Sequence, residues 1–173
     1  EIRIVNEEGK EVEVGQIGTI ELKGENIFKG YWGMEEKTKE SFKDDGFFIT
    51  GDLAKKDENG YFTIVGRDKD MIISGGLNVY PKEIEDVINE LPNIKESAVF
   101  GVQHDDFGEA VVAAVVTSDD KNDDSQILDY TKDKIAKYKQ PKKIIFMSNL
   151  PRNSMGKVQK NKLRENNKSL FKS

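Results

Sequence analysis

The sequence predicts an α+β protein, in which a small antiparallel β unit is followed by a βαββαβ-like unit. Three observations indicate this fold class. Apolar and polar residues alternate through most of residues 1–66, as in strands with one buried face. The stretch from Gly66 to Asp70 has no apolar side chain and indicates a domain boundary. After it, helical and extended patterns follow one another, which is typical of helices packed on a sheet.

Short strands and tight turns account for the first unit. Extended patterns cover residues 2–4, 17–23, 47–50 and 61–65. The Asn59-Gly60 pair is a strong hairpin signal, and Glu35 to Phe42 predicts a short helix rich in Glu and Lys. We expect these strands to form a small sheet or barrel.

Two amphipathic helices and several strands are expected after the boundary. Pro81 is placed to open the first helix and Pro92 to stop it. Its apolar face consists of Ile84, Val87, Ile88 and Leu91. Asp123 is expected to cap the second helix, and extended patterns cover residues 71–73, 97–102, 110–116 and 143–147. We expect the helices on one face of the sheet, a polar helix after the loop that runs from Pro151 to Lys160, and frayed residues from Asn166 to Ser173.

Composition excludes several classes of function. The 27 Lys and Arg residues against 32 Asp and Glu residues give a net charge of −5, which argues against nucleic acid or an anionic membrane as a partner. Because the chain has no cysteine and one histidine, it offers neither a thiol nucleophile nor a thiolate or histidine metal cluster, and we expect no metal ligands. The lack of a transmembrane-length apolar run and of cysteine fits the cytoplasm.

One polar stretch near the C-terminal end presents a lysine on a loop. It runs Pro151-Arg-Asn-Ser-Met-Gly-Lys157. Proline fixes φ on entry, Asn and Ser can bond their own backbone, and Gly156 permits conformations that a Cβ disfavours. An ammonium at Lys157 suits phosphate or carboxylate oxygens. The alternative is a solvated surface lysine. The stretch is not a P-loop, because Pro151 and Val158 stand where that motif needs Gly and Ser or Thr.

Further candidate sites each have an ordinary alternative. Asp52 after Gly51 could accept hydrogen bonds from vicinal hydroxyls such as those of a ribose, or could be a turn residue. Arg67 could bind sugar or phosphate oxygens, or pair with Asp68 or Asp70 on the surface.

Two further places remain open. The Ser74-Gly-Gly76 segment could let a ligand approach the backbone closely, or form a tight turn before the helix. His104 has no obvious partner and is interpreted as a surface loop residue.

Ordered motifs across nearly the whole chain resemble the C-terminal third of the adenylate-forming enzymes, which include acyl-CoA synthetases, peptide-synthetase adenylation domains and luciferases. These motifs are Thr50-Gly-Asp52, Gly66-Arg-Asp-Lys-Asp70, Ser74 to Glu85, Tyr138-Lys-Gln-Pro141 and Leu150 to Lys157. The resemblance implies a domain assignment. Residues 1–66 would be the distal β subdomain of the N-terminal adenylation domain, residues 67–70 a hinge, and residues 71–173 a mobile C-terminal domain.

The resemblance also implies roles for individual residues. Asp52 and Arg67 would bind the ribose of the nucleotide, and Lys157 would be the catalytic lysine that also contacts the nucleotide. Lys69 would be the hinge residue. Gly75 and Gly76 would border the pantetheine tunnel when CoA is bound.

Within the family, the segments most similar to malonyl-CoA synthetases are Gly30 to Trp32, His104 to Glu109, and Lys137 to Phe146 followed by Leu150 to Lys162. The implied reaction activates a carboxylate, malonate or a similar small acid, with ATP to an acyl-adenylate and then transfers the acyl group to CoA. Mg²⁺ would be bound mainly by the missing N-terminal domain, which would also hold the acyl pocket and the phosphate loop. We therefore expect the fragment alone to be inactive and to bind nucleotide weakly or not at all.

Other classes of function stay open on the sequence. The parent enzyme could be a medium- or long-chain fatty acyl-CoA synthetase, or an adenylating enzyme of another end use such as a peptide synthetase or a luciferase-like oxidase. Alternatively, the chain could be a non-catalytic α+β interaction module whose glycine-rich charged segments are only turns.

Overall fold

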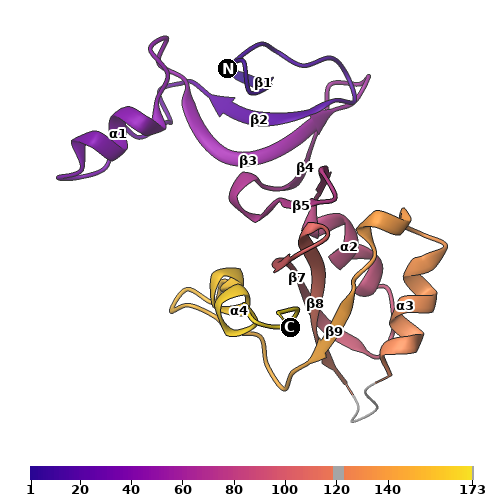
Figure 1. Ribbon diagram of the computed structural model, residues 1–173. Helices are drawn as coiled ribbons and strands as arrows, with labels where there is room; N and C mark the ends of the chain where they lie inside the picture. Colours follow the sequence, from indigo (N-terminus) through magenta and orange to yellow (C-terminus); the bar gives the residue numbers. More distant parts are fainter. Residues whose placement is uncertain (119–122, 173) are drawn as a thin grey trace. The chain divides into compact units, whose positions relative to one another are not determined.

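The computed structural model describes residues 1–118 and 123–172. The chain divides into two compact units, Glu1–Lys69 and Asp70–Ser173. The division falls inside the apolar-poor stretch from Gly66 to Asp70. Strands β1 to β4 belong to the first unit and strands β5 to β9 to the second (Figure 1). None of the helices among the described residues is both long and apolar enough to cross a membrane.

The first unit is a four-stranded antiparallel sheet. Its strands are β1 (Ile2–Val5), β2 (Ile17–Leu22), β3 (Phe48–Lys56) and β4 (Phe62–Arg67), and they lie in chain order. Because β1 and β4 stand at opposite ends of this order, the described strands form an open sheet and not a barrel. A small cluster of Ile4, Ile20 and Ala54 packs against one face. The short helix α1 (Glu35–Ser41) has no buried residue.

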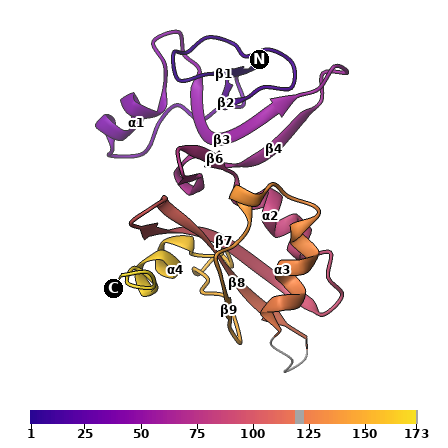
Figure 2. The same ribbon diagram turned by 45° about the vertical axis from the view of Figure 1, so that its right-hand side comes forward.

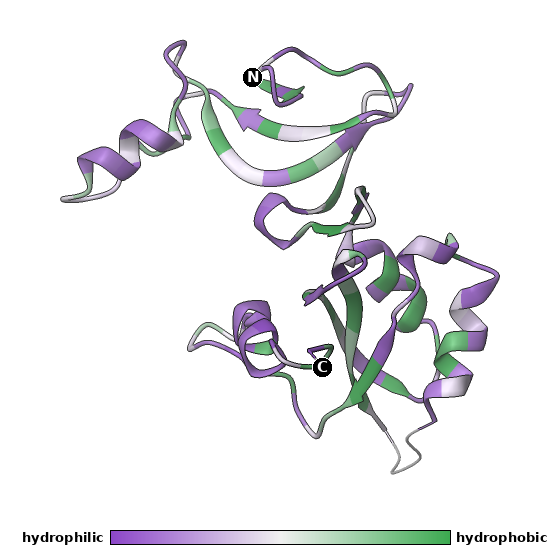
Figure 3. Cartoon of the chain, viewed as in Figure 1, coloured by the Kyte–Doolittle hydropathy of each residue, from purple (hydrophilic) through white to green (hydrophobic). Residues whose placement is uncertain are grey.

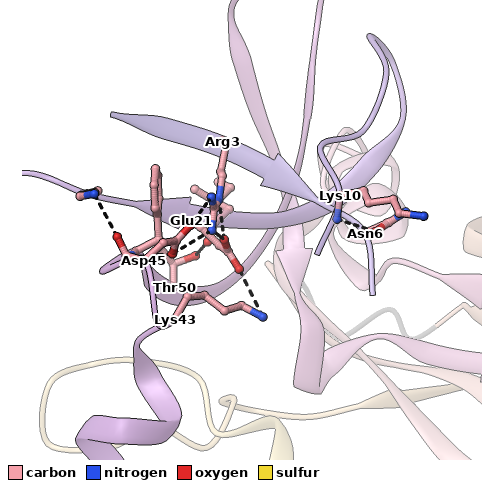
Figure 4. Close-up of polar contacts among 10 residues, drawn as sticks. Arg3, Asn6, Lys10, Glu21, Lys43, Asp45 and Thr50 are labelled. Carbon is pink, nitrogen blue, oxygen red and sulfur yellow. Dashed lines mark hydrogen bonds and ion pairs between the residues drawn. The ribbon is translucent and has the colours of Figure 1, made fainter. Parts of the chain in front are cut away.

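A charged network ties the β1–β2 hairpin to the segment before β3. Glu21 is 1% exposed, and its carboxylate lies 2.7 Å from the Arg3 guanidinium and 3.7 Å from Lys43 Nζ (Figure 4). Arg3 also contacts Asp45 at 2.7 Å, and this contact lowers the pKa of Asp45. A buried carboxylate is tolerated only when it is paired. The network therefore fixes the start of β3, the strand that carries Asp52.

The second unit is a five-stranded mixed sheet. Its strands are β5 (Ile72–Ser74), β6 (Leu77–Val79), β7 (Ile94–His104), β8 (Gly108–Thr117) and β9 (Lys143–Phe146). The order is β6-β5-β8-β7, and β9 pairs with β8 in parallel while the other pairs are antiparallel. The continuous apolar run in β8 is explained by its central place, because both faces of that strand are buried.

Helices cover both faces of this sheet. On one face α2 (Pro81–Ile88) and α3 (Asp124–Lys132) enclose a core with alternate residues of β7 and β8, including Val99 and Val111. On the other face Phe100 and Val112 pack with Leu163 of α4 (Lys160–Asn166). Figures 1 and 2 show α4 on the side of β8 opposite α3. The expectation that helices cover one face is wrong, because β7 and β8 contribute buried apolar residues to both cores. Figure 3 shows hydrophobic residues along these central strands.

The C-terminal segment is also held more firmly than expected. Leu170 and Phe171 pack against the α4 side of the core, and the Phe171 ring lies 5.1 Å from that of His104. The expectation that residues after Asn166 are frayed is therefore wrong up to residue 172, while Ser173 lies outside the described residues. Lysines flank these two apolar residues, and this is why the segment looks polar in the sequence.

Helix ends follow the local signals, with one exception. Asp123 caps α3, its side chain accepting the Ser125 backbone N–H at 3.1 Å, and Pro81 begins α2. The first helix, however, ends at Ile88, so Leu91 lies beyond it although it is buried in the same core. The short strand β6 was not predicted. It occupies the three residues before Tyr80, which is too short a stretch for alternation to be visible.

Candidate functional site

A bulge in β3 presents Asp52. Thr19 pairs with Leu53 and Glu21 with Ile49, so Ile20 alone stands opposite the three residues Thr50 to Asp52. Gly51 has φ +71°, a conformation that favours glycine. The sequence predicts a strand that ends at Thr50. The structure continues the strand to Lys56 through the bulge, a device that re-aims side chains beside functional sites.

Thr50 organises this bulge. Its hydroxyl donates to the Ile20 carbonyl at 2.9 Å and accepts the backbone N–H of Asp52 at 3.0 Å. Figure 4 shows Thr50 beside the Glu21 network. Thr50 was not among the predicted site residues. A local signal could have found it, because a threonine hydroxyl often accepts the backbone N–H two residues later in a turn.

Asp52 and Arg67 come together across neighbouring strands. They are direct partners in the β3–β4 register, and Arg67 Nε lies 2.7 Å from Asp52 Oδ1. The Asp52 side chain is 25% exposed and that of Arg67 50%. A carboxylate has two acceptor oxygens and a guanidinium five N–H donors, so a single contact leaves groups on both for a ligand.

The surface alternatives for Arg67 are not seen. Asp70 instead pairs with Arg164 of α4 at 2.9 Å, and the partner of Arg67 is Asp52. The Arg67 guanidinium therefore lies beside the Asp52 carboxylate. The family resemblance implies that these two groups bind the same ribose. Such a pair can offer acceptors and donors to vicinal hydroxyls at the same time.

Lys69 follows directly, in the 3₁₀ turn η1 (Asp68–Asp70). It is exposed, and within residues 1–118 and 123–172 its ammonium has no ion pair or hydrogen bond. Its neighbour Asp70 belongs to the second unit. Lys69 is therefore the last residue of the first unit, at the division between the two units.

Gly75 and Gly76 form the turn of the β5–β6 hairpin. Ser74 pairs with Leu77, so the two glycines are the whole loop, and their φ values of +60° and +78° are those of a type I′ turn. No heavy atom would lie within 4 Å of a Cβ added at either position, so the turn faces open space. A strand, and not the expected helix, follows the turn.

The Lys157 loop lies between β9 and α4 in the second unit. Asn153 Oδ1 accepts the backbone N–H groups of Met155 at 3.0 Å and Lys157 at 2.9 Å. Asn153 N–H in turn donates to the Lys157 carbonyl at 2.9 Å. Gly156 has φ +78°. The prediction that Asn153 bonds its own loop is confirmed, whereas the described residues give Ser154 no such bond.

The Lys157 side chain is exposed. Across the described part of the chain its ammonium makes no ion pair and no hydrogen bond. It therefore differs from Lys160, three residues later, whose ammonium lies 2.6 Å from Glu85 Oε1. A fixed backbone with a free ammonium can meet an anion without first breaking an internal contact.

The remaining motif residues have structural partners. Lys139 contacts both Glu83 oxygens at 2.7 Å. Burial opposes the charge on Lys139, but the Glu83 carboxylate outweighs it and raises the pKa of Lys139. His104 is not a loop residue: it ends β7, packs on Phe107 with ring centroids 4.7 Å apart, and accepts the Asp106 N–H through Nδ1.

The predicted site residues thus fall into separate groups. Asp52 and Arg67 form one pair in the first unit, while Gly75-Gly76 and Lys157 occupy two loops of the second. No hydrogen bond or ion pair between described residues joins those two loops. No group of three or more His, Cys, Asp or Glu side chains among the described residues is placed to hold a metal ion.

The chain is similar to known proteins along most of its length. Residues 83–157 match the family of the AMP-binding enzyme C-terminal domain. The indoleacetate–CoA ligase of Aromatoleum aromaticum is 41% identical over 165 residues, which is 95% of this chain and 32% of that protein. The long-chain-fatty-acid–CoA ligase FadD13 of Mycobacterium tuberculosis is 45% identical over 148 residues, 86% of this chain and 29% of FadD13. The chain thus spans about a third of the length of these relatives.

Among solved structures, ATP-bound MatB from Rhodopseudomonas palustris is 56% identical, with a TM-score of 0.93 over 99% of this chain and 35% of that one. The apo crystal structure of the same protein, at 57% identity and equal coverage, superposes with a TM-score of 0.75. One chain matches the two structures unequally, so the two MatB structures differ from each other over this region.

Proposed function

Because the chain belongs to the AMP-binding enzymes and carries their C-terminal domain, we propose that it is the C-terminal part of an AMP-forming acid–CoA ligase. The observation that carries the proposal is the Asp52–Arg67 pair. Two residues assigned to ribose binding from separate motifs are paired at 2.7 Å on neighbouring strands. The alternative, a non-catalytic interaction module whose charged turns bind no ligand, does not explain why these two residues are paired.

The proposed reaction has two steps. In the first, a carboxylate oxygen of the acid attacks the α-phosphorus of ATP, the bond to the β-phosphate oxygen breaks, and pyrophosphate leaves. In the second, the CoA thiolate attacks the acyl carbon, the bond from that carbon to the adenylate oxygen breaks, and AMP leaves. The products are the acyl-CoA thioester and AMP.

Lys157 acts in the first step. The acid and the α-phosphate are both anionic, and an ammonium between them stabilises the charge that develops as they approach. The exposed ammonium of Lys157, unpaired among the described residues, on a loop with a bonded backbone, fits this role. The same ammonium would obstruct the thiol in the second step, so the loop has to leave.

Rotation about Lys69 exchanges the two loops. In the second step the Gly75-Gly76 turn replaces the Lys157 loop and borders the channel for the pantetheine arm. A hinge of this kind needs only a few residues to change φ and ψ. The exposure of Lys69 and the difference between the ATP-bound and apo MatB structures support this role.

The acid is malonate or a similar small acid. MatB, a malonyl-CoA synthetase, is 56% identical over 99% of this chain, whereas the long-chain ligase FadD13 is 45% identical over 86%. This difference favours the small acid. A medium- or long-chain fatty acid is the second candidate, because ligases for such acids are also among the relatives.

The remaining ligands follow from the same proposal. ATP and CoA are the co-substrates. Mg²⁺ is assigned to the part of the enzyme outside this chain, and the described residues of this chain form no cluster of metal ligands. Bound there, the ion would neutralise charge on the phosphates. The fragment is expected to be inactive alone, and its location in the cytoplasm remains a prediction.

The test is ATP–pyrophosphate exchange by the full-length protein across malonate, methylmalonate, acetate and medium-chain acids. We expect exchange to depend on the acid and to be fastest with malonate or methylmalonate. Fastest exchange with a medium-chain acid would replace the small acid by the second candidate. A folded full-length protein that exchanges with none of the acids, or a full-length gene with no adenylation region upstream, would leave the interaction module as the better reading.

A further inference from the structure

The Lys157 loop is a closed turn with a paired stem. Arg152 and Val158 form an isolated antiparallel bridge. The Gln159 N–H donates to the Pro151 carbonyl at 2.8 Å, just outside that bridge. The stem carries the loop away from the α4 side of the core, where Val158 packs. Backbone bonds thus define the base of the loop. Within the tip, the Asn153 N–H donates to the Lys157 carbonyl and the Gly156 N–H donates to the Asn153 carbonyl at 3.0 Å, but none of these bonds joins the tip to the sheet.

Arg152 joins that tip to the sheet. Its Nη1 donates to the Gly156 carbonyl at 2.6 Å, immediately before Lys157, and its Nη2 pairs with Glu96 of β7. The Arg152 side chain is 44% exposed and that of Glu96 30%. One guanidinium therefore joins the residue preceding Lys157 to an edge strand of the sheet. Lysine cannot reproduce this geometry, because the planar fork holds two donors in fixed directions.

A second ion pair anchors the other end of the loop. Lys160 lies 2.6 Å from Glu85 Oε1, and the two side chains are 17% and 14% exposed. The same Glu85 oxygen accepts the outward N–H of Val99 at 2.7 Å. Both anchors of the loop therefore end on β7, one through Glu96 and one through Val99.

We propose that Arg152 is a positioning residue for Lys157 in the adenylation step, an inference that rests on the proposed function. The bond to the Gly156 carbonyl holds the peptide plane that leads into Lys157, and the ion pair with Glu96 keeps the guanidinium in place for that bond. Loss of Arg152 leaves the stem and the Asn153 bonds intact, but it releases the tip from the edge of the sheet. A displacement of about 1 Å can cost about 100-fold in rate.

The experiment measures both half-reactions of the full-length enzyme. For Arg152→Ala we expect ATP–pyrophosphate exchange to fall about 10- to 100-fold in kcat, with thioester formation from supplied acyl-adenylate retained. Arg152→Lys should lie between the alanine variant and the wild type. Lys134→Ala is the matched control, because it removes another ion pair of the second unit, with Glu90, that is similarly exposed. Its exchange rate should equal that of the wild type.

A charge swap separates positioning from stability. Glu96→Arg combined with Arg152→Glu restores an ion pair, but a glutamate has no N–H for the Gly156 carbonyl. We expect the swap to restore the melting temperature and not the exchange rate. Recovery of exchange in the swap would overturn the proposal, as would unchanged exchange in Arg152→Ala or an equal loss of both half-reactions.

Amide hydrogen exchange gives a readout that does not depend on activity. In Arg152→Ala, residues 153–157 should exchange faster while the rest of the second unit is unchanged. Equal protection in the variant overturns the proposal even if the protein proves not to be a ligase. If the wild type shows loop protection lost in the variant but no pyrophosphate exchange, the proposed function fails and the role of Arg152 in holding the loop stands. If Arg152→Ala does not fold, the same assays on Arg152→Lys and Glu96→Gln test the proposal in its place.

Discussion

The Asp52–Arg67 pair and the Lys157 loop hold their charged groups by different means. Asp52 and Arg67 stand on neighbouring strands in register, so the backbone ladder of β3 and β4 sets their separation. Lys157 stands on a loop whose tip is held by the side chains of Asn153 and Arg152. The strand pair thus suits a group that must keep one geometry, whereas the loop suits a group that must arrive and leave.

The two regions also differ in how their charges are satisfied. Asp52 and Arg67 neutralise each other at 2.7 Å, whereas the described part of the chain gives the Lys157 ammonium no partner. A neutral pair can bind a neutral ribose throughout a reaction. A free cation is useful only in the step that brings two anions together. The following changes test this division, beginning with the largest expected effect.

Lys157→Ala in the full-length enzyme should lower adenylation by at least about 10²- to 10³-fold, the usual cost of losing one preorganised charge-stabilising donor. Thioester formation from supplied acyl-adenylate should be largely preserved, because in the proposed reaction the lysine has left by that step. Pyrophosphate exchange and thioester formation are measured separately. Lys162→Ala, on the exposed face of α4, serves as the control. Equal loss of both half-reactions in Lys157→Ala would contradict the proposed role.

Asp52→Ala should weaken both half-reactions, because in the proposed reaction Asp52 binds the ribose in each of them. A hydrogen bond to a charged group contributes about 1.5–3 kcal/mol, so we expect the KM for ATP to rise roughly 10- to 100-fold. The exposed Glu58, in the turn that joins β3 to β4, provides the control as Glu58→Ala. If Asp52→Ala impaired adenylation alone, the strand pair would not differ from the loop in the way described.

Lys69→Pro should uncouple the two steps, because a proline ring fixes φ at the proposed hinge. Each half-reaction measured alone should be nearly retained. Overall turnover should fall by about tenfold, the change that 1.4 kcal/mol of added barrier produces. Lys69→Ala removes the side chain without fixing φ and should turn over normally. Unchanged turnover in the proline variant would refute the hinge assignment.

Gly51→Ala and Gly156→Ala form a matched pair with the smallest expected effects. Both glycines have positive φ, +71° and +78°, and open space where a Cβ would stand. Each substitution should therefore destabilise its own unit by about 1–2 kcal/mol, which denaturant unfolding measures. Gly51→Ala should weaken both half-reactions and Gly156→Ala only adenylation. The same pattern of loss in both variants would remove the distinction between the two regions.

Local features of the fold could be predicted from the sequence. The Asn59-Gly60 hairpin between β3 and β4, the Asp123 cap and the Pro81 helix start depend on neighbouring residues and were confirmed. The bulge at Gly51 was missed, because an insertion in one strand becomes visible only against the register of its partner. The place of α4 on the second sheet face was missed for a similar reason: its apolar contribution, Leu163, is a single buried residue in a charged helix.

The candidate site divides in the same way. Asp52, Arg67, Lys69, the two glycines and Lys157 could be named from their motifs, and their proposed roles come from the family resemblance. Their contacts could not be named. Glu96 lies 56 residues before Arg152 in the chain, and neither residue carries a local sign of the other.

The sequence by itself determined which residues alternate, cap and turn, and which motifs the chain shares with the AMP-binding enzymes. Those properties are set within a few residues of each position. Only the tertiary structure decided that Asp52 meets Arg67, that Arg152 reaches both Glu96 and Gly156, and that the Lys157 ammonium is left free within the described residues. These pairings depend on strand register and on the packing of distant segments, which no local pattern encodes.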